Sequence, residues 1–171
     1  MRSYYLHLAS ILSNTLAKCK LYGYNAEVKP SPKRSGCPIN AYLEVFGDRW
    51  TMLIIRDLLF KGRTHYKDFL EGGEGVATNI LASRLRLLES AGIVDSRNVD
   101  KDARRRIYRL TSKGLDLAPI LVEMVLWGAK HYKTAAPPAI IRKMKRDRNA
   151  FLTDLRSTHA NPHLRRGEEA Q

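Results

Sequence analysis

The fold is decided by Gly75-Val-Ala-Thr-Asn-Ile-Leu-Ala-Ser-Arg-Leu-Arg-Leu-Leu-Glu-Ser-Ala-Gly-Ile-Val94, which predicts a single amphipathic helix with a clear start and a clear end. Thr78 or a neighbouring residue is expected to cap the first turn, because a side-chain oxygen there can accept hydrogen bonds from unpaired helix amides. Gly92 ends the helix in the left-handed conformation that glycine tolerates best. Ile93 and Val94 then begin a strand.

This helix has two unlike faces at about 100° per residue. One is a continuous apolar arc that consists of Ile80, Leu81, Leu85, Leu87, Leu88 and Ala91. The opposite face is short and polar, with one charge, and carries Thr78, Asn79, Ala82, Ser83 and Arg86. A face of this kind can enter a DNA major groove and reach base edges. We therefore predict base-edge contacts by Thr78, Asn79, Ser83 and Arg86, the alternative being an ordinary solvated helix face.

Arg84 differs from Arg86 because it projects toward the middle of the apolar arc. It either pairs with an acid such as Asp57 or runs along the flank of the helix to a DNA phosphate. The structural role is favoured, and Arg84 stays a weak candidate for contact with the DNA backbone.

The composition favours a polyanionic partner. The chain has 171 residues, enough for one well-cored domain with extensions, and 30 Lys and Arg against 17 Asp and Glu give a net charge of +13. Part of the excess lies in each terminal extension, and within the central region basic residues cluster between Arg97 and Arg109. Nucleic acid is the partner that such clustering favours.

Several function classes find no support in the sequence. Two cysteines, Cys19 and Cys37, are too few for a disulfide framework and lack the companions of a zinc site, which indicates a reducing cytoplasm. No apolar run is long enough to span a bilayer. No metal-ligand cluster, phosphate-binding loop or nucleophile motif is recognisable, so no metal, cofactor or enzymatic activity is expected.

The segments before the central helix complete a helix-turn-helix. Residues 38–46 predict a short helix, and Asp48 caps a second helix over 49–60. Residues 63–70 have room for an extended piece followed by a small helix, and 72–75 form a glycine turn. Helix, short helix, glycine turn and helix in this order are typical of a helix-turn-helix motif.

A hairpin after the central helix forms the wing. Strands are predicted over 93–98 and 107–110, joined by a polar loop that ends in three arginines, and we expect phosphate or minor-groove contacts from Arg104, Arg105 and Arg106. The start of the small helix would also meet the DNA backbone, so weaker candidates there are Arg63, His65 and Lys67. A merely soluble surface is the alternative for both groups.

The C-terminal part predicts a dimerisation helix and a basic extension. Thr111 caps a long helix over 112–133, which Pro119 bends without ending it. Its apolar residues cover more than one stripe, which suggests a second subunit as partner. The predicted interface consists of Leu121, Met124, Val125 and Trp127. A basic helix follows over 139–156, and the tail after it is expected to be disordered.

A series of short motifs resembles one family. They are Cys37-Pro-Ile, Gly47-Asp-Arg-Trp50, Ile55-Arg-Asp-Leu-Leu59, Leu81-Ala-Ser-Arg-Leu-Arg-Leu-Leu-Glu89, Ala91-Gly-Ile-Val94, Tyr108-Arg-Leu-Thr-Ser-Lys-Gly-Leu115 and Trp127-Gly. Each motif is weak alone, but the series, in this order and spacing over 37–133, resembles the HxlR-type winged helix-turn-helix regulators of bacteria. The resemblance implies a homodimer in which the first helix and the long C-terminal helix pair, and two recognition helices enter successive major grooves.

The chain departs from this family in two places. The wing has Asp102-Ala-Arg-Arg-Arg106 where a proline pair is common, and residues 1–36 form an extension that family members typically lack. We divide the chain into an N-terminal extension and linker (1–36), which is either poorly ordered or a loosely attached helix, a winged-helix domain (37–133), and a basic C-terminal helix with a tail (134–171).

Cys37 is a candidate sensor thiol. It stands at the start of the helix over 38–46, where the partial positive charge of the helix end and nearby Lys33 and Arg34 favour a thiolate. A small apolar residue at a dimer interface would give the same pattern, so both interpretations stay open, and Cys19 is expected to be a bystander. Many members of the resembled family have a cysteine at this position, and some respond through it to electrophiles or oxidants.

The sequence thus predicts a mainly helical protein with a small β-hairpin wing and a C-terminal dimerisation helix. Its expected function is that of a cytoplasmic, homodimeric regulator that binds a double-stranded DNA operator, with an unidentified small-molecule or electrophile effector. The alternative is a basic structural protein that binds nucleic acid without sequence preference. Binding curves at two salt concentrations separate the two, because purely electrostatic binding has a steep salt slope and no preferred site.

Overall fold

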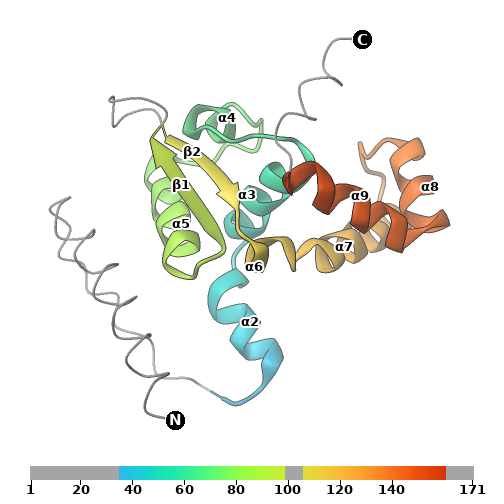
Figure 1. Ribbon diagram of the computed structural model, residues 1–171, viewed down its shortest axis with the longest axis horizontal. Helices are drawn as coiled ribbons and strands as arrows, with labels where there is room; N and C mark the ends of the chain where they lie inside the picture. The colour runs from blue at the N-terminus through green and yellow to red at the C-terminus, as the bar shows by residue number, and fades with distance from the viewer. Residues whose placement is uncertain (1–34, 99–105, 161–171) are drawn as a thin grey trace, which may run out of the picture. The chain divides into compact units, whose positions relative to one another are not determined.

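The computed structural model describes residues 35–98 and 106–160, and the chain divides into two units between Gly36 and Cys37. Within the described part of the second unit, the elements are helices and one antiparallel hairpin, which lies at one side of the helices next to α5 (Figure 1). The elements in chain order are α2 (Pro38–Phe46), α3 (Arg49–Phe60), α4 (Tyr66–Leu70), α5 (Thr78–Ser90), β1 (Val94–Asn98), β2 (Arg106–Leu110), α6 (Ser112–Leu115), α7 (Ala118–His131), α8 (Pro138–Arg146) and α9 (Arg148–Ala160). The predicted fold class, mainly helical with a small hairpin, is confirmed.

Helix α3 is the centre of the core. Its side chains Ile55, Leu58 and Leu59 are almost fully buried and belong to one cluster with Leu81, Leu85 and Leu88 from the apolar arc of α5. Burial of each such side chain contributes about 1.5–3 kcal/mol relative to exposure. This packing fixes which side of α5 turns inward, and therefore which side is left for a partner.

The start of α3 is set by Asp48, as the sequence predicts. Its Oδ1 accepts hydrogen bonds from the backbone amides of Trp50 at 3.0 Å and Thr51 at 3.1 Å. Partial burial acts to raise the pKa of Asp48, but the hydrogen bonds from Thr51 and Trp50 and the charge of Arg84 outweigh it and hold the pKa below its ordinary value. The cap therefore stays ionised and stabilises the first turn at neutral pH.

The hairpin follows α5 through Gly92, which has a φ of 68° and ends the helix as predicted. Strands β1 and β2 pair antiparallel in a register that runs from Val94 opposite Leu110 to Asn98 opposite Arg106. The extended piece before α4 joins them by a bridge between His65 and Ile107. Extended segment, hairpin and α5 thus form one packed assembly.

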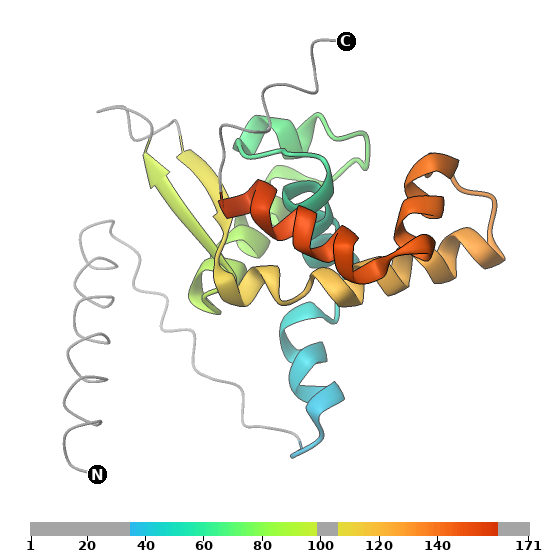
Figure 2. The same ribbon diagram turned by 45° about the vertical axis from the view of Figure 1, so that its right-hand side comes forward.

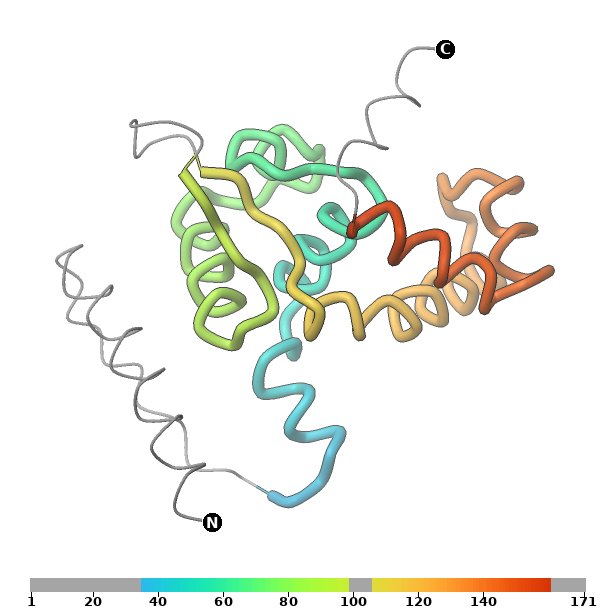
Figure 3. Tube along the Cα trace, in the orientation of Figure 1, coloured from blue at the N-terminus to red at the C-terminus, as the bar shows by residue number. Residues whose placement is uncertain are grey.

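Two details at the helix ends differ from the sequence-based expectation. The N-cap of α5 is Ala77, which has no side-chain oxygen, and Thr78 is the first helical residue. The expected single helix over 112–133 is two helices, because α6 ends at Leu115 and α7 begins at Ala118 (Figure 3). Pro119 has no amide hydrogen to continue the hydrogen bonding of α6, so it lies in the first turn of a new helix.

The expected basic helix over 139–156 is also two helices, and the second continues to Ala160, into the tail that was expected to be disordered. Asp147 separates α8 from α9, because its backbone is extended and its Oδ1 accepts a hydrogen bond from Ala150 N at 2.9 Å. The two helices fold back along α7 (Figure 2), where Val122, Met144 and Phe151 form a second small core. Through this core the C-terminal helices pack with the winged part of the chain.

Candidate nucleic-acid interface

The outward face of α5 carries the four predicted base-contacting residues. Thr78, Asn79, Ser83 and Arg86 are all exposed, whereas Leu81, Leu85 and Leu88 on the other face are buried. Positions 79, 83 and 86 recur at intervals of four and three residues, so they form one row along the helix. A rigid helix that packs against the core on one face and presents short polar side chains on the other is the arrangement that major-groove reading requires.

The first turn of α5 has no side-chain cap from its N-cap residue. The methyl side chain of Ala77 cannot accept a hydrogen bond from the first backbone amides of the helix, so the partial positive charge of the helix end is left for an anion. The hydroxyl of Tyr66 in α4 donates to the carbonyl oxygen of Thr78 at 2.7 Å and holds this end in place. This end of α5 therefore has the electrostatic character that favours an anion.

Arg84 is paired within the protein. Its Nε lies 3.1 Å from Oδ1 of Asp48, the N-cap of α3, so the acid that pairs with it is Asp48 and not the Asp57 that the sequence offered as an example. The ion pair joins α5 to the start of α3. Arg84 is therefore already engaged in orienting the helix.

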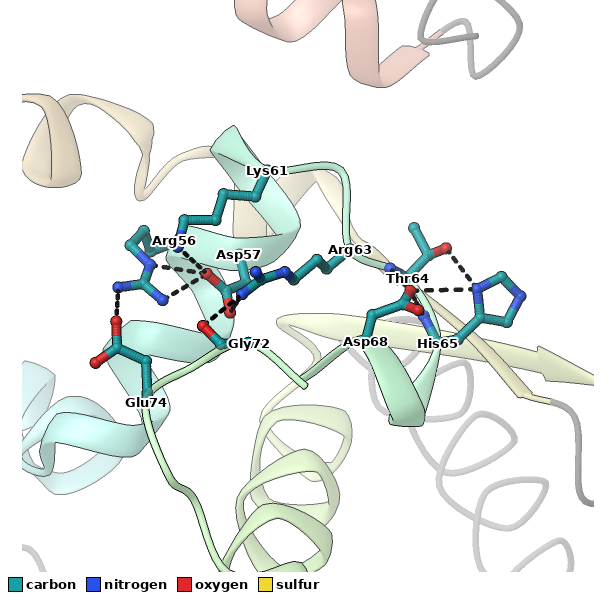
Figure 4. A network of polar contacts seen from close by, with 9 residues as sticks. All are labelled: Arg56, Asp57, Lys61, Arg63, Thr64, His65, Asp68, Gly72 and Glu74. Atoms are coloured by element: carbon teal, nitrogen blue, oxygen red, sulfur yellow. Dashed lines mark hydrogen bonds and ion pairs between the residues drawn. The ribbon is translucent and has the colours of Figure 1, made fainter. Parts of the chain in front are cut away.

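The three weaker candidates near α4 have different surroundings. Arg63 is half-buried, and its Nη1 donates to Asp57 Oδ2 at 2.8 Å. His65 is exposed at the N-cap of α4, and its backbone amide donates to Asp68 at 2.8 Å (Figure 4). Lys67 is exposed and forms a loose ion pair with Glu71 at 3.4 Å. His65 and Lys67 thus lie on the surface, whereas Arg63 is committed to an internal contact.

The predicted wing arginines are only partly within the described residues. Arg104 and Arg105 lie outside them, and Arg106 is an exposed residue at the start of β2. Arg106 Nη2 lies 3.3 Å from Glu89 Oε1 in α5, and Ser96 in β1 donates to the same carboxylate oxygen. Glu89, which no local sequence signal marks, therefore ties the hairpin to α5.

The candidate dimer residues of α7 divide between its surface and its core. Met124 and Trp127 are 52% and 59% exposed, but Leu121 is 4% exposed and packs in the core of its own chain. Leu121 therefore cannot offer surface to a second subunit, and Val125 is half-buried beside the C-terminal helices. Ile120, 41% exposed, completes a row with Met124 and Trp127 at helical spacing that the sequence analysis missed.

A second exposed apolar pair lies on α2. Ile39 and Leu43 are 69% and 51% exposed, one helical turn apart. Cys37 is exposed at the N-cap of the same helix, directly before Pro38. The candidate thiol and this apolar pair thus share one short helix.

Neither a metal cluster nor a membrane span is found in the part of the chain that the structure describes. Within residues 35–98 and 106–160, histidine, cysteine and carboxylate side chains do not gather in groups of three. None of the described helices has the length and apolar character needed to cross a membrane.

Among the curated relatives that match part of this chain are two transcriptional regulators. The uncharacterized HTH-type transcriptional regulator Rv3095 of Mycobacterium tuberculosis is 34% identical over 113 residues, which is 66% of this chain and 70% of that protein. The HTH-type transcriptional regulator YodB of Bacillus subtilis is 33% identical over 92 residues, 53% of this chain and 81% of YodB.

Solved structures show the same fold. The structure of PA1607, a protein assigned as a transcription factor, matches with a TM-score of 0.53 and 38% sequence identity. The match covers 61% of this chain and 72% of that chain. The redox regulator HypR in its oxidized form has a TM-score of 0.52 and 26% identity, covering 57% of this chain and 100% of HypR. The family model described as HxlR-like helix-turn-helix matches residues 45–136. This protein therefore belongs to the HxlR-like helix-turn-helix family.

Proposed function

We propose that this protein is a cytoplasmic transcriptional regulator that binds a two-fold DNA operator as a homodimer. The observation that carries this proposal is the outward face of α5, where Thr78, Asn79, Ser83 and Arg86 are exposed while the buried leucines fix the helix on α3. Family membership and relatives named as transcriptional regulators support the same function. The role is one of binding, without a catalytic step or cofactor.

The exposed apolar residues support a second copy of the chain as partner. Ile120, Met124 and Trp127 on α7, with Ile39 and Leu43 on α2, leave large apolar side chains in water on two helices. A two-fold dimer can cover the same surface on both subunits, because its interface is self-complementary. A dimer would also present two α5 helices to two half-sites of one operator.

The thiol of Cys37 is proposed as the point where an oxidant or electrophile acts. Cys37 is exposed at a helix N-terminus, which favours the reactive thiolate, and the two apolar residues of α2 follow it. The redox regulator HypR, among the structural neighbours, fits this proposal. Modification of Cys37 would then alter the subunit contact made by α2.

A second candidate function, non-specific binding to nucleic acid, is favoured by α8. This helix has four basic residues and no acidic one, and an open hollow of about 590 Å³ is lined by Ala139, Arg142, Lys143, Lys145 and Arg146. Lys143 pairs with Asp154, whereas Arg142, Lys145 and Arg146 have no ion pair among the described residues. Such a surface can attract any phosphate backbone.

Selection of bound duplexes from a random-sequence pool tests the proposed function. The proposal predicts strong enrichment of one motif with two-fold symmetry, at a spacing of about 10 base pairs between half-sites. Recovery of unenriched sequence, with affinity that depends steeply on salt alone, would contradict it and favour the second candidate.

A further inference from the structure

Asp57, near the C-terminal end of α3, is a buried carboxylate that three cations surround (Figure 4). It is 4% exposed, and its Oδ1 accepts a hydrogen bond from Arg56 Nε at 2.8 Å. Its Oδ2 accepts one from Arg63 Nη1 at 2.8 Å, and Lys61 Nζ lies 3.6 Å from Oδ1. A buried carboxylate needs such partners, since an unpaired charge in the interior is strongly destabilising.

The two arginines extend this contact to the turn before α5. Arg63 Nη1 also donates to the carbonyl oxygen of Gly72 at 3.3 Å. Arg56 Nη1 donates to Glu74 Oε1 at 2.6 Å, and this hydrogen bond holds the pKa of Glu74 below its ordinary value. Asp57 is thereby linked to two points of the turn, two residues apart.

The turn itself has little to hold its conformation. Three of the four residues from 72 to 75 are glycines, and Gly73 and Gly75 have φ angles of 79° and 72°. Glycine loses more conformational freedom on folding than any other residue, so such a turn needs external contacts to stay in one conformation. A Cβ atom at Gly72 would lie 2.5 Å from Arg63 Nη1, so glycine lets the arginine reach this carbonyl.

The proposed base-contacting residues begin directly after this turn. Thr78 and Asn79 are the first two residues of α5, three and four positions beyond Gly75. The turn therefore acts on these two side chains first, together with the hydrogen bond from Tyr66 to the carbonyl oxygen of Thr78, while the leucines further along α5 stay packed in the core. Displacement of a binding group by about 1 Å is enough to weaken specific contacts strongly.

We propose that Asp57 is the positioning residue of the DNA-reading helix, holding the Gly72–Gly75 turn through Arg56 and Arg63. Asp57 itself touches no DNA, and Arg63 is a link in this network rather than a phosphate contact. The inference rests on the proposed function, because it assigns a role in reading an operator.

Glu74→Gln separates positioning from simple charge. Removing a negative charge near DNA would by electrostatics alone strengthen binding, whereas loss of the Arg56 link would weaken specific binding. We expect Glu74→Gln, which loses one charge-assisted hydrogen bond, to lower the ratio of operator to random-duplex affinity about tenfold. Arg56→Gln also loses the hydrogen bond to Asp57, so it should lower the ratio at least as much. The double variant should lose no more than Arg56→Gln alone, because that variant already lacks the link between Arg56 and Glu74.

The measurement uses the full chain, with affinities from titration at one salt concentration and circular dichroism to show that each variant is folded. Asp57→Asn should show the same loss of discrimination with a lower melting temperature, and Glu74→Gln, at an exposed residue, keeps the test decisive if Asp57→Asn does not fold. A matched control is the exposed ion pair between Arg156 and Asp116, at 2.9 Å, where Arg156→Gln and Asp116→Asn should leave the ratio unchanged.

The outcomes separate this inference from the proposed function. If the wild-type protein prefers the operator and the Glu74→Gln variant prefers it equally or more strongly, only the proposed role of Asp57 is overturned, and the proposed function stands. A wild-type protein without any preferred sequence overturns the proposed function on which that role depends.

Discussion

Ala77 occupies the N-cap position of α5, directly before the residues proposed to read DNA, and its methyl side chain cannot accept a hydrogen bond. Substitution by Asp would supply the missing cap and raise the free energy of unfolding by about 1 kcal/mol. The same carboxylate would repel a phosphate at this helix end, so we expect DNA affinity to fall about tenfold at low salt. Chemical denaturation and DNA titration of the same preparation measure the two effects.

The neutral cap Ala77→Ser is the control for this prediction. It should stabilise the protein to a similar extent while weakening DNA binding less than Ala77→Asp does. An Ala77→Asp variant that is more stable and binds DNA as tightly as the wild-type protein would show that no phosphate lies at this helix end.

Cys37 is proposed as the responsive thiol because it is exposed at the start of α2. Treatment with diamide or a quinone should change operator affinity of the wild-type protein several-fold and leave Cys37→Ser unaffected, since serine forms no reactive thiolate. Titrations before and after treatment measure this. Equal responses of both proteins would remove Cys37 from the mechanism.

Single-residue pairings were the least predictable features from the sequence. The position of Arg84 on the inner side of α5 indicated a structural role, but its partner proved to be Asp48 rather than Asp57. Both acids belong to the α3 region, and only the packing of α5 across α3 decides which one the guanidinium meets. Asp57 instead pairs with Arg56 and Arg63, whose roles required the fold of the turn to be known.

At the scale of elements, α7 is the helix on which the proposed dimer depends. Trp127→Glu should convert the dimer to a monomer, because it places a charge within the proposed apolar interface. Trp127 is 59% exposed in the single chain, so the fold of each subunit should tolerate the change. Sedimentation velocity checks the assembly state, and circular dichroism checks the fold.

A negative charge introduced at another exposed position provides the control for Trp127→Glu. Asn149 in α9 is exposed and outside the row formed by Ile120, Met124 and Trp127, so Asn149→Glu should leave the dimer intact. A Trp127→Glu variant that sediments as a dimer would contradict the assignment of this row to the interface.

Helix positions followed well from the sequence where local signals were strong. Pro38, Asp48 and Gly92 mark the ends of α2, α3 and α5 through local chemistry, and each of these boundaries is confirmed. The breaks before α7 and α9 were missed, because apolar periodicity continued through Pro119 and Asp147. Part of the apolar excess of α7 also faces α8 and α9, a long-range contact that periodicity within one helix cannot reveal.

At the scale of the whole molecule, the recognition surface and the subunit contact must act together. The outward face of α5 could be predicted from its amphipathic period, and the fold class from the order of helices, glycine turn and hairpin along the chain. The basic hollow on α8 could not be predicted from the sequence, because its position depends on how Met144 anchors that helix against α7. Specific reading by α5 and non-specific attraction by basic surfaces are separable contributions to one affinity.

The most direct test of the account is the ratio of operator to random-duplex affinity in an Asn79→Ala, Arg86→Ala variant. Each bidentate base contact contributes about 1–3 kcal/mol of discrimination, so we expect the ratio to fall about 30-fold or more. The matched variant Asn149→Ala, Arg146→Ala removes the same two side-chain types from exposed sites in the C-terminal helices and should keep the ratio. A ratio that survives in the α5 variant would contradict the claim that this helix reads DNA.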